Sequence, residues 1–156
     1  LMRAVMAFIP EKDTGLIPNM LTQILDTCVN GITLSDPDQP DNPIVFANKV
    51  FEDMTGYPQE EIIGRNCRFL HGDDRDQPGL ESIREAMRTE SRVEVVLRNY
   101  RRSGEMFHNQ LTVQPLHDEN GQLIYYLGVQ YDITPIVTAR EEADRMAALF
   151  NRPDEA

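Results

Sequence analysis

Three side-chain amides lie where the sequence pattern calls for apolar residues. Asn99 and Asn109 each belong to the apolar row of an expected strand. Gln130 belongs to a third row, which it shares with Ile124, Tyr126 and Gly128. A buried amide without hydrogen-bond partners costs about 1 to 3 kcal/mol, so these three need partners. Either the amides form a network with water or lie at strand edges, or a planar heterocycle offers them both donors and acceptors.

Two cysteines, Cys28 and Cys67, are the other candidates for chemistry. They are too few for a disulfide framework, and no cluster of Cys and His has the spacing of metal ligands. Free thiols and no metal site are therefore expected. A lone cysteine is more often a small buried apolar residue than a reactive one, so residue type alone assigns neither cysteine a role.

Hydrophobic periodicity and turn residues predict the elements that must position these side chains. The N-terminal half predicts an amphipathic helix over 19–28, a hairpin of strands 31–35 and 44–47, short helices within 49–64, and a firmer helix over 78–88. The C-terminal half predicts strands over 93–101, 106–114 and 122–131, then a charged helix over 135–150. The order predicts an α+β domain whose five-stranded antiparallel sheet carries short helices on one face.

Composition narrows the class of protein. The 156 residues, 40% of them hydrophobic, fit one globular domain with flanking helices. With no run of about 18 apolar residues and no signal peptide, a cytoplasmic protein is expected. The net charge of −11 argues against direct contact with nucleic acid or an anionic membrane, and favours a protein partner. The initial Leu1 is compatible with a fragment of a longer protein.

One segment, Gly64-Arg-Asn-Cys-Arg-Phe-Leu-His-Gly72, resembles the GxNCRFLQ signature of light-oxygen-voltage (LOV) domains, a subclass of PAS domains. Five further segments match the family in order and spacing: 41–44, 51–57, 99–104, 107–109 and 128–132. The resemblance implies the PAS fold and divides the chain into an N-terminal extension with a capping helix (1–29), a LOV core (30–134) and a C-terminal helix (135–156). It is similar to short bacterial LOV photoreceptors.

The resemblance also implies a cofactor and a reaction. Cys67 would open a short helix beneath the ring of non-covalently bound flavin mononucleotide (FMN) and form a reversible cysteinyl adduct with flavin carbon C4a in blue light. Asn99 and Asn109 would bind the pyrimidine edge of the flavin. Gln130 would bind flavin O4 and relay the change to the sheet. Cys28 lies outside the matching segments and is expected to be structural.

The remaining matches concern the flavin side chain. Arg68 and Arg84 would hold the phosphate, since a guanidinium clamps phosphate oxygens and keeps its charge. Arg75 is either a third phosphate contact or part of a surface ion pair with its aspartate neighbours. Asn66 and His71 would contact the ribityl chain, although His71 stands where the family usually has glutamine and adds a group that titrates near neutrality. His108, where tryptophan is common, is expected at the surface.

The sequence does not identify the effector to which the protein would signal. No effector pattern follows Phe150, and no nucleophile-base constellation indicates an enzyme. The favoured reading is a stand-alone light sensor that forms a homodimer through its flanking helices and signals to an unknown protein. The other readings are the sensory half of a larger receptor and a PAS-type flavin redox sensor. Fold alone does not choose among them.

Overall fold

A computed structural model describes residues 16–151, with side chains from Met20 onward, so the expected extension over 1–15 lies outside the described residues. Five strands form one antiparallel sheet in the order β2-β1-β5-β4-β3. Their bounds are β1 Gly31–Ser35, β2 Ile44–Ala47, β3 Val93–Tyr100, β4 Met106–His117 and β5 Leu123–Asp132. The α+β class and the predicted five-stranded antiparallel sheet are confirmed.

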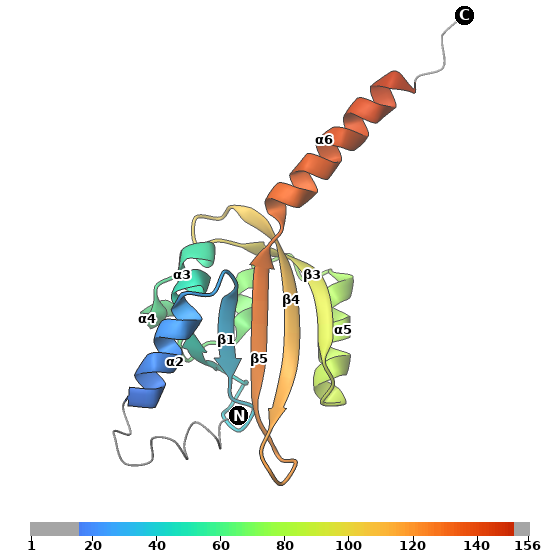
Figure 1. Cartoon of the computed structure of the whole chain (residues 1–156). Coiled ribbons are helices and arrows are strands. Elements are labelled where there is room, and N and C mark those ends of the chain that lie inside the picture. Colours follow the sequence, from blue (N-terminus) through green and yellow to red (C-terminus); the bar gives the residue numbers. More distant parts are fainter. Residues whose placement is uncertain (1–15, 152–156) are drawn as a thin grey trace, which may run out of the picture.

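The helices fall into two groups (Figure 1). Those between β2 and β3 in the chain lie over one face of the sheet: α3 Lys49–Thr55, α4 Gln59–Ile62, the 3₁₀ helix η1 Cys67–His71 and α5 Pro78–Arg88. The flanking helices are α2 Leu16–Asp26 and α6 Thr134–Phe150, and α6 extends away from the sheet where β5 ends. The sheet face under the first group is called the inner face below.

Local side-chain chemistry sets these helix boundaries. Asn48 caps α3 by accepting a hydrogen bond from the backbone N–H of Phe51 at 3.1 Å. The buried Asn48 amide also donates to the backbone carbonyls of Leu25 and Asn30, so one side chain joins the end of α2 to α3. Gly56 ends α3 in the left-handed region with φ 77°, which costs glycine no steric penalty.

The larger differences between the expected elements and the structure lie at three places. The first helix begins at Leu16 and ends at Asp26, two residues before its predicted end, and the carboxylate of Asp26 accepts a hydrogen bond from the backbone N–H of Lys49. Strand β4 runs three residues further than predicted, to His117. Ile124, expected to share the buried row of Gln130, is 38% exposed because pairing becomes irregular at this end of the sheet.

The apolar core is divided into two clusters. One contains Ile44, Ala47, Phe51, Ile62 and Leu70, and the other contains Leu80, Leu97 and Leu111. Members of both clusters line the same cavity, which separates the helical layer from the inner face of β3, β4 and β5. An ordinary core packs without such a void, so the gap between the clusters has the form of a binding site.

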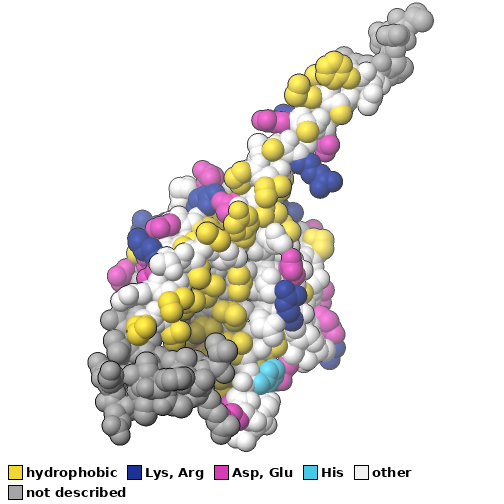
Figure 2. Space-filling model, in the orientation of Figure 1, with side chains coloured by type: hydrophobic (Ala, Val, Ile, Leu, Met, Phe, Trp, Pro, Cys, Tyr) yellow, Lys and Arg dark blue, Asp and Glu magenta, His cyan; other side chains and the backbone are white. Residues whose placement is uncertain are grey.

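Apolar side chains are also exposed outside the core. Figure 2 shows them over the sheet face beside α2 and along α6. Every residue of α6 except Thr134 and Val137 is exposed, and the exposed fraction of Phe150 reaches 84%. Within residues 16–151, no helix has the length and apolar character needed to cross a membrane.

Candidate functional site

A cavity of about 460 Å³ lies between the inner sheet face, η1, α5 and the loop over residues 36–43. This volume is within the range of about 300 to 1,000 Å³ that holds cofactors and other small molecules. Nine residues singled out from the sequence all line it: Asn66, Cys67, Arg68, His71, Arg75, Arg84, Asn99, Asn109 and Gln130. Residues up to 64 positions apart in the chain therefore meet in one site.

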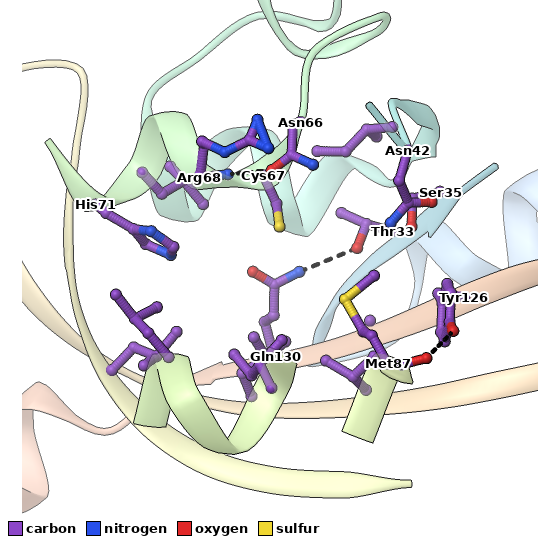
Figure 3. A pocket seen from close by; sticks show the side chains of 18 of the residues that line it. Thr33, Ser35, Asn42, Asn66, Cys67, Arg68, His71, Met87, Tyr126 and Gln130 are labelled. Carbon is purple, nitrogen blue, oxygen red and sulfur yellow. Dashed lines mark hydrogen bonds between the residues drawn. The ribbon is translucent and has the colours of Figure 1, made fainter. Parts of the chain in front are cut away.

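The three amides form a chain of hydrogen bonds across β3, β4 and β5. Asn109 donates to Oδ1 of Asn99 at 2.9 Å and to Oε1 of Gln130 at 3.1 Å. Gln130 in turn donates to the hydroxyl of Thr33 on β1 at 3.3 Å (Figure 3). All three amides are buried, and Oδ1 of Asn109 has no hydrogen-bond partner among the described residues. Such an orphaned acceptor calls for an N–H or O–H donor from a ligand or water.

Gly128 keeps the wall beside Gln130 open. A Cβ atom at this position would lie 2.5 Å from the hydroxyl of Thr33 and 3.5 Å from the amide nitrogen of Gln130. Any larger residue would therefore displace the hydrogen bond between Thr33 and Gln130. The glycine preserves both the hydrogen bond and the space above the sheet.

Cys67 is the first residue of η1, and Asn66 caps that helix by accepting from the backbone N–H of Arg68 at 3.0 Å. In Figure 3 the sulfur of Cys67 points into the cavity, toward the amide of Gln130 on the opposite wall. Solvent reaches the thiol through the cavity, yet the surrounding protein desolvates it. This desolvation raises the pKa of Cys67, and the nearby guanidinium of Arg68 offsets it only in part. The side chain is therefore a protonated thiol at neutral pH.

Arg68, Arg75 and Arg84 bring three positive charges to the cavity wall from η1, the loop after it, and α5. Arg68 forms an ion pair with Asp41, and Arg84 pairs with Glu81 one turn earlier on α5. Arg75 donates to the backbone carbonyl of Gly72 at 3.3 Å. Asp74, one of the two aspartate neighbours of Arg75, pairs instead with Arg98 on β3.

The pKa of His71 is sensitive to all three of these positive charges. Its ring is half-buried in the cavity wall (Figure 3). Burial lowers the pKa of His71, and the positive charges of Arg75, Arg68 and Arg84 lower it further. One end of the cavity thus combines a neutral imidazole with three guanidinium groups, an environment that favours an anion.

The side chain of Asn66 is already engaged by protein. Its amide donates to the backbone carbonyl of Asp41 at 2.7 Å, and its carbonyl caps η1. A ribityl contact from Asn66 therefore has to share these groups. Further polar residues on the wall were not expected as site residues from the sequence: Thr33, Ser35, Gln39, Asp41 and Asn42. For Thr33 the signal was the strict alternation of β1, which puts Gly31, Thr33 and Ser35 on one face.

The walls between the amide chain and the arginines are apolar, formed by Leu80, Ile83, Leu97, Leu111 and Val113. A flat apolar ring system with a hydrogen-bonding edge and an anionic tail matches this distribution. No group of His, Cys, Asp and Glu within residues 16–151 has an arrangement that would hold a metal ion.

Comparison with known proteins agrees with this geometry. A PAS domain model matches residues 29–135. A blue-light photoreceptor of Listeria innocua is 43% identical over 74% of this chain and 46% of its own length. The blue-light-activated histidine kinase 1 of Erythrobacter litoralis is 48% identical over 88% of this chain and 39% of its own. The solved structure of an RNA-binding light-oxygen-voltage receptor has a TM-score of 0.76 at 33% identity, covering 92% of this chain and 40% of that one.

The chain spans less than half the length of these relatives, so the likeness concerns one domain of each. That domain contains the sheet, the cavity and the segment Gly64–Gly72. The chain belongs to the PAS domain family and, within it, to the light-oxygen-voltage domains.

Proposed function

We propose that this chain is a blue-light photoreceptor module that binds FMN in the cavity and forms a reversible bond between Cys67 and the flavin. The observation that carries the proposal is the position of the Cys67 thiol opposite Gln130, across a cavity that three arginines also line. The photoreceptor names of the relatives support it.

The amide chain suits the polar edge of a flavin. Oδ1 of Asn109 is a buried acceptor without a partner, and the ring N–H of a flavin pyrimidine is a donor of the right kind. Asn99 and Gln130 offer amide groups that either donate or accept, so they can serve the neighbouring ring carbonyls. The apolar walls, with Leu97 and Leu111 among them, bind the ring faces.

A bound flavin would supply absorption of blue light and a ring carbon that reacts with a thiol. Cys67 would provide that thiol, and its raised pKa keeps sulfur and hydrogen together in the dark. A protonated thiol is a poor nucleophile, so Cys67 would not add to the flavin in the dark. This protonation state favours a light-driven function over a dark cysteine chemistry.

The arginine end of the cavity would hold the FMN phosphate. Arg68 and Arg84 can form charge-assisted hydrogen bonds with phosphate oxygens. Arg75 lies near the same end of the cavity, since its charge, like theirs, lowers the pKa of His71. Neutral His71 would then face the ribityl chain with one donor and one acceptor. Each arginine must exchange its present protein contact for the ligand or share it.

For the output, we infer a sensory module that forms a homodimer and acts on a protein effector, without enzymatic activity of its own. Asp132 at the end of β5 accepts hydrogen bonds from the backbone of Thr134 at 2.9 Å and from Arg101 at 2.7 Å. These contacts attach α6 to the strand that carries Gln130. The exposed apolar residues of α6, among them Ile136 and Phe150, offer a surface for a second copy.

The deciding experiment is a visible absorption spectrum of the purified protein before and after blue light. We expect flavin bands that bleach on illumination and return in the dark, together with release of FMN on denaturation. A protein that binds no flavin would contradict the proposal. Bound flavin that responds to reductant but not to light would instead support the redox-sensing alternative.

A further inference from the structure

Asp41 forms a two-point ion pair with Arg68, one of the three arginines that line the cavity. Nη1 of Arg68 donates to Oδ2 of Asp41 at 2.6 Å, and Nη2 donates to Oδ1 at 2.5 Å. This two-point contact is the geometry in which a guanidinium also binds phosphate oxygens. The carboxylate of Asp41 thus occupies Arg68 as an anion supplied by the chain itself.

The backbone of the 36–43 loop is built to present this carboxylate. Asp41 and Asn42 have φ values of 67° and 46°, in the left-handed region that only a few per cent of non-glycine residues adopt. Asn66 holds the turn by donating to the carbonyl of Asp41 at 2.7 Å. The residues on both sides of Cys67 therefore bind Asp41: the side chain of Asn66 contacts its backbone carbonyl, and the side chain of Arg68 contacts its carboxylate.

We propose that Asp41 competes with the phosphate of the ligand for Arg68 and thereby sets how strongly the site prefers FMN over unphosphorylated riboflavin. This inference rests on the proposed flavin-binding function. It makes Asp41 a specificity-determining residue, because its charge opposes only the part of the ligand that distinguishes the two flavins.

The ion pair is suited to such an exchange. The side chains of Arg68 and Asp41 are 44% and 62% exposed, and ion pairs this exposed to solvent contribute little net free energy. A ligand phosphate can therefore displace the carboxylate or share the guanidinium with it. In either case the carboxylate remains beside the phosphate, and its negative charge weakens the attraction of the three arginines.

Asp41→Asn tests the proposal, since asparagine removes the charge and tolerates the left-handed backbone. Affinities for FMN and for riboflavin are measured by fluorescence quenching in the dark with flavin-free protein. We expect the ratio of FMN affinity to riboflavin affinity to rise about threefold to fivefold. Asp38→Asn is the matched control, because it removes the same charge from the same loop at an exposed position that does not line the cavity.

The same measurements in an Arg68→Ala background locate the effect. If Asp41 acts through Arg68, adding Asp41→Asn to Arg68→Ala leaves the affinity ratio unchanged. Asp41→Gly, which also accepts a positive φ, should reproduce the result of Asp41→Asn and guards against an effect peculiar to asparagine. Thermal melting of each variant shows whether the fold is retained.

A second measurement needs no flavin. The negative charge of Asp41 contributes to the raised pKa of Cys67, so Asp41→Asn should lower the pH at which the thiol reacts with an alkylating reagent. An unchanged affinity ratio in folded Asp41→Asn, or an equal rise in Asp38→Asn, overturns the inference while leaving flavin binding intact. Failure of the wild-type protein to bind either flavin would instead remove the proposed function itself.

Discussion

Asp74 and Arg98 form a two-point ion pair that fastens the segment after η1 to strand β3. Nε of Arg98 donates to Oδ2 of Asp74 at 2.7 Å, and Nη2 donates to Oδ1 at 2.8 Å. Tyr100 adds a hydroxyl hydrogen bond to the same carboxylate at 2.7 Å. This contact determines where the chain leaves His71 and enters α5, and hence the position of the arginine end of the cavity.

The first prediction is a dependence of stability on pH that originates at Asp74. The hydrogen bonds from Arg98 and Tyr100 lower the pKa of Asp74 from 3.8 to about 2. A lowered pKa means that the contribution to stability is complete above pH 3.8 and is lost as the pH falls toward 2. Asp74→Asn should therefore lower the urea midpoint at pH 7 and lose most of that effect near pH 2. An equal loss at both pH values would contradict the role assigned to this carboxylate.

Replacing Cys67 should abolish the photochemical reaction, whereas replacing Cys28 should not. Cys67→Ala should bind flavin and fluoresce but show no reversible bleaching, because the cavity then contains no thiol. Cys28→Ala should behave as wild type, since Cys28 does not line the cavity and its sulfur donates to the backbone carbonyl of Ile24 at 3.4 Å, near the end of α2. Absorption spectra of both variants before and after blue light provide the check. Persistent bleaching in Cys67→Ala would refute the assignment.

The arginines should discriminate between phosphorylated and unphosphorylated flavin. We expect Arg68→Ala and Arg84→Ala each to weaken FMN binding roughly tenfold and to change riboflavin binding little, from the value of a charge-assisted hydrogen bond. Arg88→Ala is the matched control on α5, because Arg88 pairs with Glu85 and does not line the cavity. Titration of flavin-free protein with both ligands measures the difference, and equal losses for both flavins would exclude the phosphate role.

His71 should make the dark recovery sensitive to pH in a defined range. Burial and the charges of Arg75, Arg68 and Arg84 lower the pKa of His71 below 6.5, whereas the nearby Asp74 acts in the opposite direction. The ring is therefore neutral at pH 7 and gains a proton only below 6.5. Recovery times measured between about pH 5 and 8 should show an inflection in the acidic part for wild type and none in His71→Gln. The same inflection in the variant would assign it to another group.

The light signal should depend on Gln130. Its amide bonds Asn109 and Thr33, and β5 ends two residues later at the contact between Asp132 and Thr134. Wild type should differ between dark and light in helix arrangement or association, measured by small-angle scattering or sedimentation.

Gln130→Leu should keep the light-induced bleaching and reduce that difference, whereas Gln122→Leu, in the exposed turn before β5, should retain it. Identical dark and light curves for fully bleached wild type would rule out this route of signalling.

Much of the fold could be predicted because its signals are local. Pro78 at the first turn and the apolar spacing of Leu80 and Ile83 marked α5 with the bounds it has in the structure. Glycines in the left-handed region at Gly104 and Gly121 marked the two turns that separate β3, β4 and β5. The strand ends were less accurate, because the register irregularity after Leu116 depends on the partner strand.

The candidate site divides in the same way. The alternation within each strand drew attention to the amides, and the resemblance to LOV domains named the thiol and the arginines. Only the tertiary structure decided that the amide nitrogen of Asn109 donates to both Asn99 and Gln130 while its Oδ1 has no partner among the described residues, and that Asp41 reaches Arg68 across 27 positions. Such contacts depend on how distant strands and loops meet, and sequence periodicity carries no information about which side chain faces which across a cavity.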